Sequence, residues 1–488
     1  MVFSSMSFLF FFLPALLAVY YMLPALLRWA LPGNRTEIFR TRLRGARNII
    51  LLAFSLFFYA YGGLRFLLLM LASIIINYTG GLLASPENNK YTRKSGILTA
   101  VILGLGLLGW FKYSGFLAES INMLGTNIPI PKVTLPIGIS FYTFQGLSYV
   151  IDVYRGDVSV QKNPVKVALY ISLFPQLVAG PIVRYSAIEK EIDSNRENFN
   201  DFAAGAIRFV FGLSKKMLLA NSLGEIADRL FSNTQGPLSV LAAWVGALAY
   251  TGQIYFDFSA YSDMAIGLGR MFGFHFLENF NYPYIAKSVT EFWRRWHISL
   301  SEWFRDYLYI PLGGNRAGMI KQIRNIIIVW ILTGLWHGAA WNFVLWGAWF
   351  GALLLGEKFI WGKLLDKAPS GLRHFYTMLL VILSWVFFRS NTAPAALQYI
   401  GMMFGSSGKL YDKQGVYYII EYFPEILCGV IAVFPLKIRI ARFLDRKRGA
   451  ASDALLLWGP RILGLALLAL SYLKLATGSF NPFIYFRF

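Results

Sequence analysis

Long apolar runs alternate with short polar connections along most of the chain. The runs cover residues 8–27, 49–71, 97–110 and 462–473, and Arg65 is the only charged residue inside the second. The longest runs reach the roughly 20 residues that a helix needs to cross a hydrocarbon layer. This pattern predicts an all-α, polytopic integral membrane protein.

The middle of the chain, residues 135–349, differs from this pattern because Gly, Pro, Asp, Arg and His interrupt its apolar runs. Such residues are tolerated at membrane depth only where they face a polar cavity or partner helices. Function is therefore expected to concentrate here. Three segments carry the interruptions: residues 135–155, 174–184 and 253–267.

Each of these segments suggests a departure from a regular span. Pro136 and Gly138 predict a kinked helix. The Gly and Pro content of residues 174–184 predicts a re-entrant turn, and Asp257 and Asp263 lie among aromatic residues. Two interpretations stay open for all three segments: hydrogen bonding between helices of a large bundle, or the lining of a cavity.

Two basic clusters predict the orientation in the membrane. Lys and Arg accumulate in cytoplasmic loops, so both clusters are expected inside and the N-terminus outside. No Lys or Arg precedes Arg28, so the first apolar run lacks the charged region of a cleavable signal peptide and is expected to stay as a transmembrane helix. The clusters comprise Arg28, Arg35, Arg40, Arg42, Arg44 and Arg47, and then Lys437, Arg439, Arg442, Arg446, Lys447 and Arg448.

Composition supports the membrane class and excludes several others. Hydrophobic residues make up 56% of the 488 residues and charged residues 15%, against about 25% charged in soluble domains. Lys and Arg accumulate in the cytoplasmic loops of membrane proteins, which accounts for the net charge of +21. No nucleic-acid partner is therefore expected. A single cysteine, Cys428, cannot form an intrachain disulfide. No metal, P-loop or nucleophile-elbow motif occurs, and no bound cofactor is expected.

His337 is the most informative of the four histidines. It is the only ionisable residue between Arg324 and Glu357, in an otherwise apolar stretch. A titratable group in such a stretch is a functional-site hypothesis by default. The alternative is a histidine buried in the core with its hydrogen bonds satisfied. His275 and His374 lie beside loops and are expected to have ordinary structural roles.

A second histidine, His297, lies in a basic and aromatic segment. Composition predicts an amphipathic helix at the membrane interface, with Trp at headgroup level and Arg reaching for anionic groups. The segment either binds lipid phosphate or forms a phosphate-binding rim around an intramembrane cavity, as the phosphates of a CoA thioester require. The candidate donor-binding residues are Arg294, Arg295, Trp296 and Arg305.

These residue types suit acyl transfer from a soluble thioester. His337 is expected to take the proton from an acceptor hydroxyl as it attacks the thioester carbonyl. Backbone N–H groups near the glycine-containing turn, or the imidazole of His297, would hold the developing oxyanion. A transporter and a scaffold subunit of a polysaccharide export complex are the alternatives, because polar residues in a broken-helix bundle also line translocation paths.

Several motifs resemble the membrane-bound O-acyltransferase family, and most closely a bacterial branch that acetylates polysaccharides. They follow one another in order along nearly the whole chain: MVFSSMSFLFFFLP, LPIGISFYTFQGLSYVIDVYRG, FPQLVAGPIVRY, YFDFSAYSDMAIG, FWRRWHISLSEWFRDYLYIPLGGNR, GLWHGAAWNFVLWG and FNPFIYFRF.

The resemblance implies a fold of roughly 11 transmembrane helices, with re-entrant and interfacial helices around a central catalytic cavity. Residues 1–488 would form one domain with its catalytic core at about 135–350. The family's catalytic histidine falls on His337 and its second histidine on His297.

The resemblance also implies an activity and a location. Acetyl from cytoplasmic acetyl-CoA would cross the bacterial inner membrane to an extracytoplasmic partner acyltransferase, which modifies an alginate-like polysaccharide first and peptidoglycan second. A narrow passage is expected to reach His337 from both faces. Trp336, Trp341 and Trp346 would line it, and Gly334, Gly338, Ala339 and Ala340 would thin the helix around it.

Overall fold

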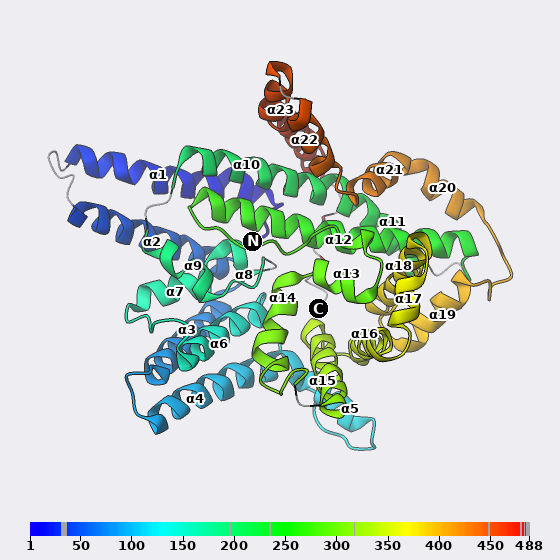
Figure 1. Ribbon diagram of the computed structural model, residues 1–488, viewed down its shortest axis with the longest axis horizontal. Coiled ribbons are helices and arrows are strands. Elements are labelled where there is room, and N and C mark those ends of the chain that lie inside the picture. The colour runs from blue at the N-terminus through cyan, green and yellow to red at the C-terminus, as the bar shows by residue number, and fades with distance from the viewer. Residues whose placement is uncertain are drawn as a thin grey trace. The chain divides into compact units, whose positions relative to one another are not determined.

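The computed structural model describes residues 1–30, 37–178, 180–194, 197–233, 236–316, 318–447, 449–478, 481–482 and 484. Every regular element in these ranges is a helix, so the all-α prediction is confirmed (Figure 1). The described chain forms two compact units, which are taken in turn.

The first unit comprises Met1–Phe209 and Met264–Leu277. Helix α3 packs against both α4 and α6. A Cβ added at Gly96 on α4 would lie 2.7 Å from the backbone nitrogen of Ala84 on α3, so the glycine permits the close approach of these two helices. The elements are η1 (Phe8–Phe12), α1 (Leu13–Ala30), α2 (Glu37–Ala60), α3 (Leu64–Ala84), α4 (Lys90–Leu108), η2 (Gly109–Tyr113), α5 (Ser114–Asn122), α6 (Ile139–Arg155), α7 (Pro164–Ser172), α8 (Phe174–Leu177), α9 (Tyr185–Ile192) and α10 (Phe199–Ser214).

The second unit comprises Val210–Asp263 and Glu278–Phe488, so α10 and α12 each run from one unit into the other. Helix α16 packs against α15 and α18, which brings together helices of the functional region. The remaining elements are η3 (Lys215–Ala220), α11 (Asn221–Phe231), α12 (Val240–Met271), η4 (Pro283–Ile285), α13 (Val289–Arg295), α14 (Ile298–Phe304), η5 (Arg305–Tyr309), α15 (Met319–His337), α16 (Trp341–Phe359), α17 (Gly362–Lys367), α18 (Ser370–Arg389), α19 (Ala393–Met403), α20 (Lys413–Glu421), α21 (Phe423–Ala432), α22 (Leu436–Lys447) and α23 (Ala450–Ala476).

Six helices in the described ranges are long and apolar enough to cross a membrane, and α20 with α21, bent by 68°, would make a seventh. The chain is a multi-pass membrane protein. The expected total of about 11 spans stays a prediction. Helices α12 and α16 are not among the six, and the apolar helix over Phe8–Leu23 is shorter than any of them. The six are Thr41–Ala60, Leu64–Ala84, Lys90–Asn122, Met319–His337, Ser370–Arg389 and Ala450–Ala476.

The prediction of a helix kinked at Pro136 and Gly138 is wrong. Helix α6 begins after both residues, and Gly138 lies just before it with a φ of 76°. A Cβ at this position would lie 2.3 Å from the carbonyl oxygen of Leu177, so both the backbone conformation and the packing require glycine. In the described part of residues 174–184, which leaves out residue 179, the only helix is the four-residue α8, and α9 begins at Tyr185.

Candidate functional site

His337 is the last residue of α15, not the middle of a helix. Its side chain is 7% exposed, and Gly338 follows in an extended conformation with φ −164° and ψ 150°. The next helix, α16, begins at Trp341. Gly338, Ala339 and Ala340 therefore form the turn between α15 and α16 and do not thin a helix, which corrects that expectation.

Close packing of α15 on α16 holds this turn. A Cβ at Gly334 would lie 2.2 Å from the carbonyl oxygen of Phe343, and one at Gly347 would lie 2.2 Å from the carbonyl oxygen of Trp330. Real Cβ atoms do not approach backbone atoms this closely, so the two glycines permit a contact that no larger residue allows. Figure 1 shows the two helices side by side.

An aromatic pocket surrounds the His337 side chain. The imidazole centroid lies 5.1 Å from the Trp346 ring and 5.3 Å from the Phe388 ring, both edge-to-face. Of the three tryptophans expected to line a passage, only Trp346 lines the pocket, and Trp341 is 52% exposed. The lining residues are Ile254, Phe258, Trp296, His337, Trp346, Trp385, Phe388 and Ile484.

His297 lies beside His337, with 6.4 Å between the two ring centroids. It is fully buried and stands between α13 and α14 in a left-handed conformation, with φ 44° and ψ 55°. The expected interfacial segment is therefore two short helices with His297 at their break, not one helix. Burial, and then the nearby His337, lower the pKa of His297 well below its usual value, so its ring is neutral at pH 7.

The candidate donor-binding residues have different surroundings. Trp296 is buried and lines the His337 pocket. Arg295 is paired with Glu291 at 2.8 Å, and Arg305 with the adjacent Asp306 at 2.6 Å. The lining of the pocket includes none of the three arginines.

Arg294 is the exposed arginine of this group whose guanidinium makes no ion pair within the described chain. It therefore remains available for an external anion. Arg295 and Arg305, in contrast, already have a carboxylate partner.

Sequence reasoning missed Glu357, which holds the start of α13. This buried carboxylate on α16 accepts hydrogen bonds from the backbone nitrogens of Val289 at 2.7 Å and Thr290 at 2.9 Å. It also accepts one from the Thr290 hydroxyl at 2.6 Å. A carboxylate suits the free N–H groups and positive dipole of a helix N-terminus. The only sequence signal was an acidic residue at the end of an apolar helix.

A buried ion pair holds the C-terminal segment at the pocket. Lys216 lies 2.8 Å from Asp257, with side-chain exposures of 4% and 1%. The other carboxylate oxygen of Asp257 accepts a hydrogen bond from the backbone nitrogen of Ile484 at 2.9 Å, and Lys216 donates to the carbonyl oxygen of Pro482. Lys215 pairs with Asp263 in the same region. Both aspartates singled out in the sequence are thus paired with lysine.

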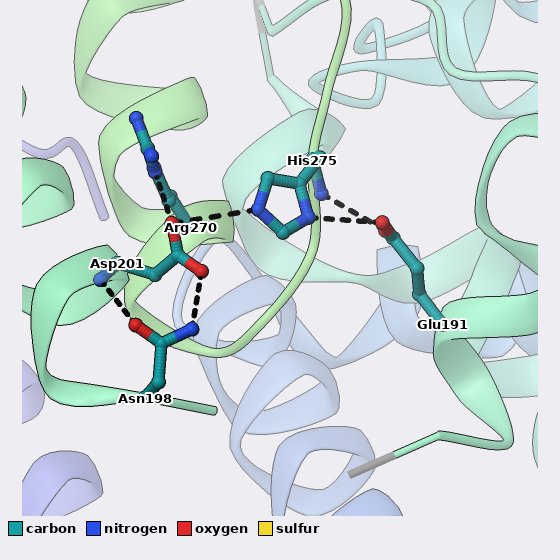
Figure 2. Close-up of polar contacts among 5 residues, drawn as sticks. All are labelled: Glu191, Asn198, Asp201, Arg270 and His275. Carbon is teal, nitrogen blue, oxygen red and sulfur yellow. Dashed lines mark hydrogen bonds and ion pairs between the residues drawn. The ribbon is translucent and has the colours of Figure 1, made fainter. Parts of the chain in front are cut away.

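The remaining histidines have structural partners, as expected. In the first unit, His275 Nδ1 lies 2.9 Å from a Glu191 oxygen, and Nε2 lies 3.6 Å from Asp201 (Figure 2). Hydrogen bonds from Arg270 first, and from Asn198 second, lower the pKa of Asp201. In the second unit, His374 Nδ1 lies 3.1 Å from the carbonyl oxygen of Ala286.

The arrangement can perform acid–base chemistry in a water-poor environment. It brings two imidazoles together beside an apolar pocket, and neutral imidazole is the side chain best suited to move protons near pH 7. No group of three or more His, Cys, Asp or Glu side chains in the described part of the chain is placed to hold a metal ion.

Comparisons with known proteins find a family and several relatives to which this chain is similar. The model of the membrane-bound O-acyltransferase family matches residues 155–390. The probable alginate O-acetylase AlgI of Azotobacter vinelandii is 40% identical over the full length of both chains. The peptidoglycan O-acetyltransferase of Helicobacter pylori is 36% identical over 72% of this chain and 73% of its own. The teichoic acid D-alanyltransferase of Bacillus subtilis is 28% identical over 51% of this chain and 66% of its own.

Proposed function

As this chain belongs to the membrane-bound O-acyltransferase family, we propose that it passes acetyl from cytoplasmic acetyl-CoA across the bacterial inner membrane for O-acetylation of an extracytoplasmic polysaccharide. It is an O-acyltransferase, and this class disfavours the transporter and scaffold alternatives. An alginate-like polymer is the first candidate and peptidoglycan the second, following the names of the full-length and partial relatives.

The observation that carries the proposal is His337 at the wall of the aromatic pocket, with His297 as its neighbour. His337 takes the proton of an acceptor hydroxyl while the hydroxyl oxygen attacks the thioester carbonyl. The new C–O bond forms, the C–S bond breaks, and the departing thiolate of CoA takes up the proton. The apolar lining of the pocket disfavours water beside His337, which would limit hydrolysis of the thioester.

The acceptor in this proposal is a hydroxyl of a partner acyltransferase, not the polymer itself. The pocket is narrow and almost entirely apolar, with five aromatic rings besides His337 in its lining. A hydrated polysaccharide chain would lose its hydrogen bonds to water there without gaining protein partners. In this proposal the protein therefore interacts directly with the lipid bilayer and the partner acyltransferase, and only indirectly with the polysaccharide.

The central test compares His337→Ala with His374→Ala, a matched control because His374 bonds to a backbone carbonyl outside the pocket. Purified protein receives radiolabelled acetyl-CoA and a candidate partner, and both label transfer and CoA release are measured. We expect His337→Ala to lose about 10²–10⁴-fold in rate, the usual contribution of general-base catalysis, and the control to retain activity. More than about a tenth of wild-type turnover in His337→Ala would exclude His337 as the base.

Binding of the donor is tested at Arg294. We expect Arg294→Ala to raise the KM for acetyl-CoA by about 1.4- to fivefold, since exposed charge pairs contribute about 0.2–1 kcal/mol. The salt dependence of KM should become flatter, because salt screens contacts with phosphate. Arg305→Ala is the control, as its guanidinium is already paired with Asp306. If Arg294→Ala leaves the salt dependence of KM unchanged, we would conclude that Arg294 binds lipid phosphate and not acetyl-CoA.

A further inference from the structure

Asn279 connects the loop after α12 to the break that carries His297. Its side chain is fully buried, and its Oδ1 accepts hydrogen bonds from the backbone nitrogen of Ser299 at 3.1 Å and from the Ser299 hydroxyl at 2.9 Å. The same oxygen lies 3.3 Å from Nδ1 of His297. The backbone carbonyl of Asn279 also accepts a hydrogen bond from Ile298 at 3.0 Å.

The Ser299 contact determines the orientation of the Asn279 amide. A backbone N–H can only donate, so the atom facing it must be the amide oxygen and not the amide nitrogen. This oxygen has no hydrogen to offer. Nδ1 of His297 must therefore carry the ring hydrogen, because two lone pairs would otherwise face each other at 3.3 Å.

The tautomer of His297 follows from this contact. A neutral imidazole with hydrogen on Nδ1 has a bare lone pair on Nε2. Nε2 is buried and has no hydrogen-bond partner among the described residues. Within the proposed acyl transfer, the single hydrogen of the acceptor hydroxyl goes to His337. A buried acceptor beside His337 is then suited to receive a hydrogen bond from an N–H of the imidazolium that forms there.

We propose that Asn279 is a positioning residue that holds His297 as the Nδ1–H tautomer, so that Nε2 acts as a hydrogen-bond acceptor in the reaction. This inference rests on the proposed function and narrows it. A neutral His297 of this form offers no N–H from Nε2, so it cannot stabilise the oxyanion from that atom. Oxyanion stabilisation then falls to other donors, such as the backbone N–H groups expected near the glycine-containing turn.

Asn279 also has a helix-capping role, which the test must separate from tautomer control. His297 makes no side-chain capping bond to α14, and Asn279 supplies that bond through Ser299. Asn279→Asp keeps an oxygen acceptor for both contacts and adds a negative charge. Ser299→Ala is the matched control, since it removes one hydrogen bond to the same oxygen without changing the His297 contact.

The first measurement is the tautomer itself, in the full chain labelled with ¹⁵N-histidine in lipid nanodiscs. His297→Gln identifies the His297 signals by difference. We expect a protonated Nδ1 and an unprotonated Nε2 in the wild type near pH 7.5. A protonated Nε2 would overturn the proposal. This readout needs no turnover, so it remains decisive even if the protein proves not to transfer acetyl.

The second measurement is the pH profile of kcat/KM for acetyl transfer. The carboxylate in Asn279→Asp stabilises protonated His297 and raises its pKa, so the acidic limb should move to higher pH by about 1–3 units. Ser299→Ala should keep the wild-type profile, even with lower thermal stability. If a folded Asn279→Asp variant keeps the wild-type pH profile, Asn279 acts only as a helix cap and does not control the tautomer of His297.

Discussion

At the scale of single residues, the chemistry of each ionisable group depends on its immediate partners. His275 lies between two carboxylates at the surface of the first unit, whereas His297 and His337 are surrounded by aromatic rings. The same residue type therefore serves structure in one place and is suited to proton transfer in another.

The Lys216–Asp257 pair provides a stability prediction at this scale. We expect Asp257→Ala to lower the free energy of unfolding by about 3–5 kcal/mol, because it leaves the buried Lys216 charge without its partner. The double variant Lys216→Met with Asp257→Leu should recover much of this loss, because apolar replacement of both partners removes the uncompensated charge. Thermal unfolding in detergent measures both effects, and a double variant less stable than Asp257→Ala would contradict this account.

At the scale of elements, glycine contacts decide how the functional helices pack. Gly334 and Gly347 allow close contact between the backbones of α15 and α16. The resulting helical hairpin fixes the end of α15 at His337, directly before the turn into α16. Two capped short helices, α13 and α14, then place His297 beside it.

We expect Gly334→Ala to reduce both thermal stability and acetyl transfer. The new methyl group would lie 2.2 Å from the carbonyl oxygen of Phe343, so α16 must move away from α15. Overpacking of this kind typically costs about 1–3 kcal/mol. Gly464→Ala in α23 is the control, since its Cβ would have nothing within 4 Å. Equal melting temperatures for the two variants would show that the α15–α16 contact tolerates separation.

At the scale of the whole molecule, the proposed reaction depends on orientation, because donor and acceptor stand on opposite sides of the membrane. Positive charge clusters place the N-terminus outside in our interpretation, which puts the start of α2 inside and its end outside. Arg42 lies in the first turn of the candidate span Thr41–Ala60, and Tyr61 directly follows its last residue. Both side chains are exposed. They therefore form a matched pair at the two ends of one span.

We expect Tyr61→Cys to react with a membrane-impermeant thiol reagent in intact cells, and Arg42→Cys to react only after lysis. The background must carry Cys428→Ser, because the native cysteine is exposed. Labelling is measured by mass shift on gels. Reaction of Arg42→Cys alone in intact cells would invert the orientation and place the donor site on the opposite face.

The sequence by itself determined the class of the molecule and the region of its site. Apolar run lengths predicted a multi-pass helical membrane protein, and a lone histidine in an apolar stretch identified His337. The prediction of the class is confirmed because burial in lipid constrains composition residue by residue, whereas the role of His337 stays a prediction. The motifs and their order along the chain also indicated the family, because motif order can be seen in the sequence without a structure.

Only the tertiary structure decided how the site is assembled. It placed His297 at a break with φ 44°, brought Ile484 to the pocket, and assigned Glu357 and Asn279 as remote helix caps. Apart from the backbone conformation of His297, each of these features is a contact between residues far apart in sequence. Its free energy depends on distance, direction and exclusion of water, which local composition does not encode.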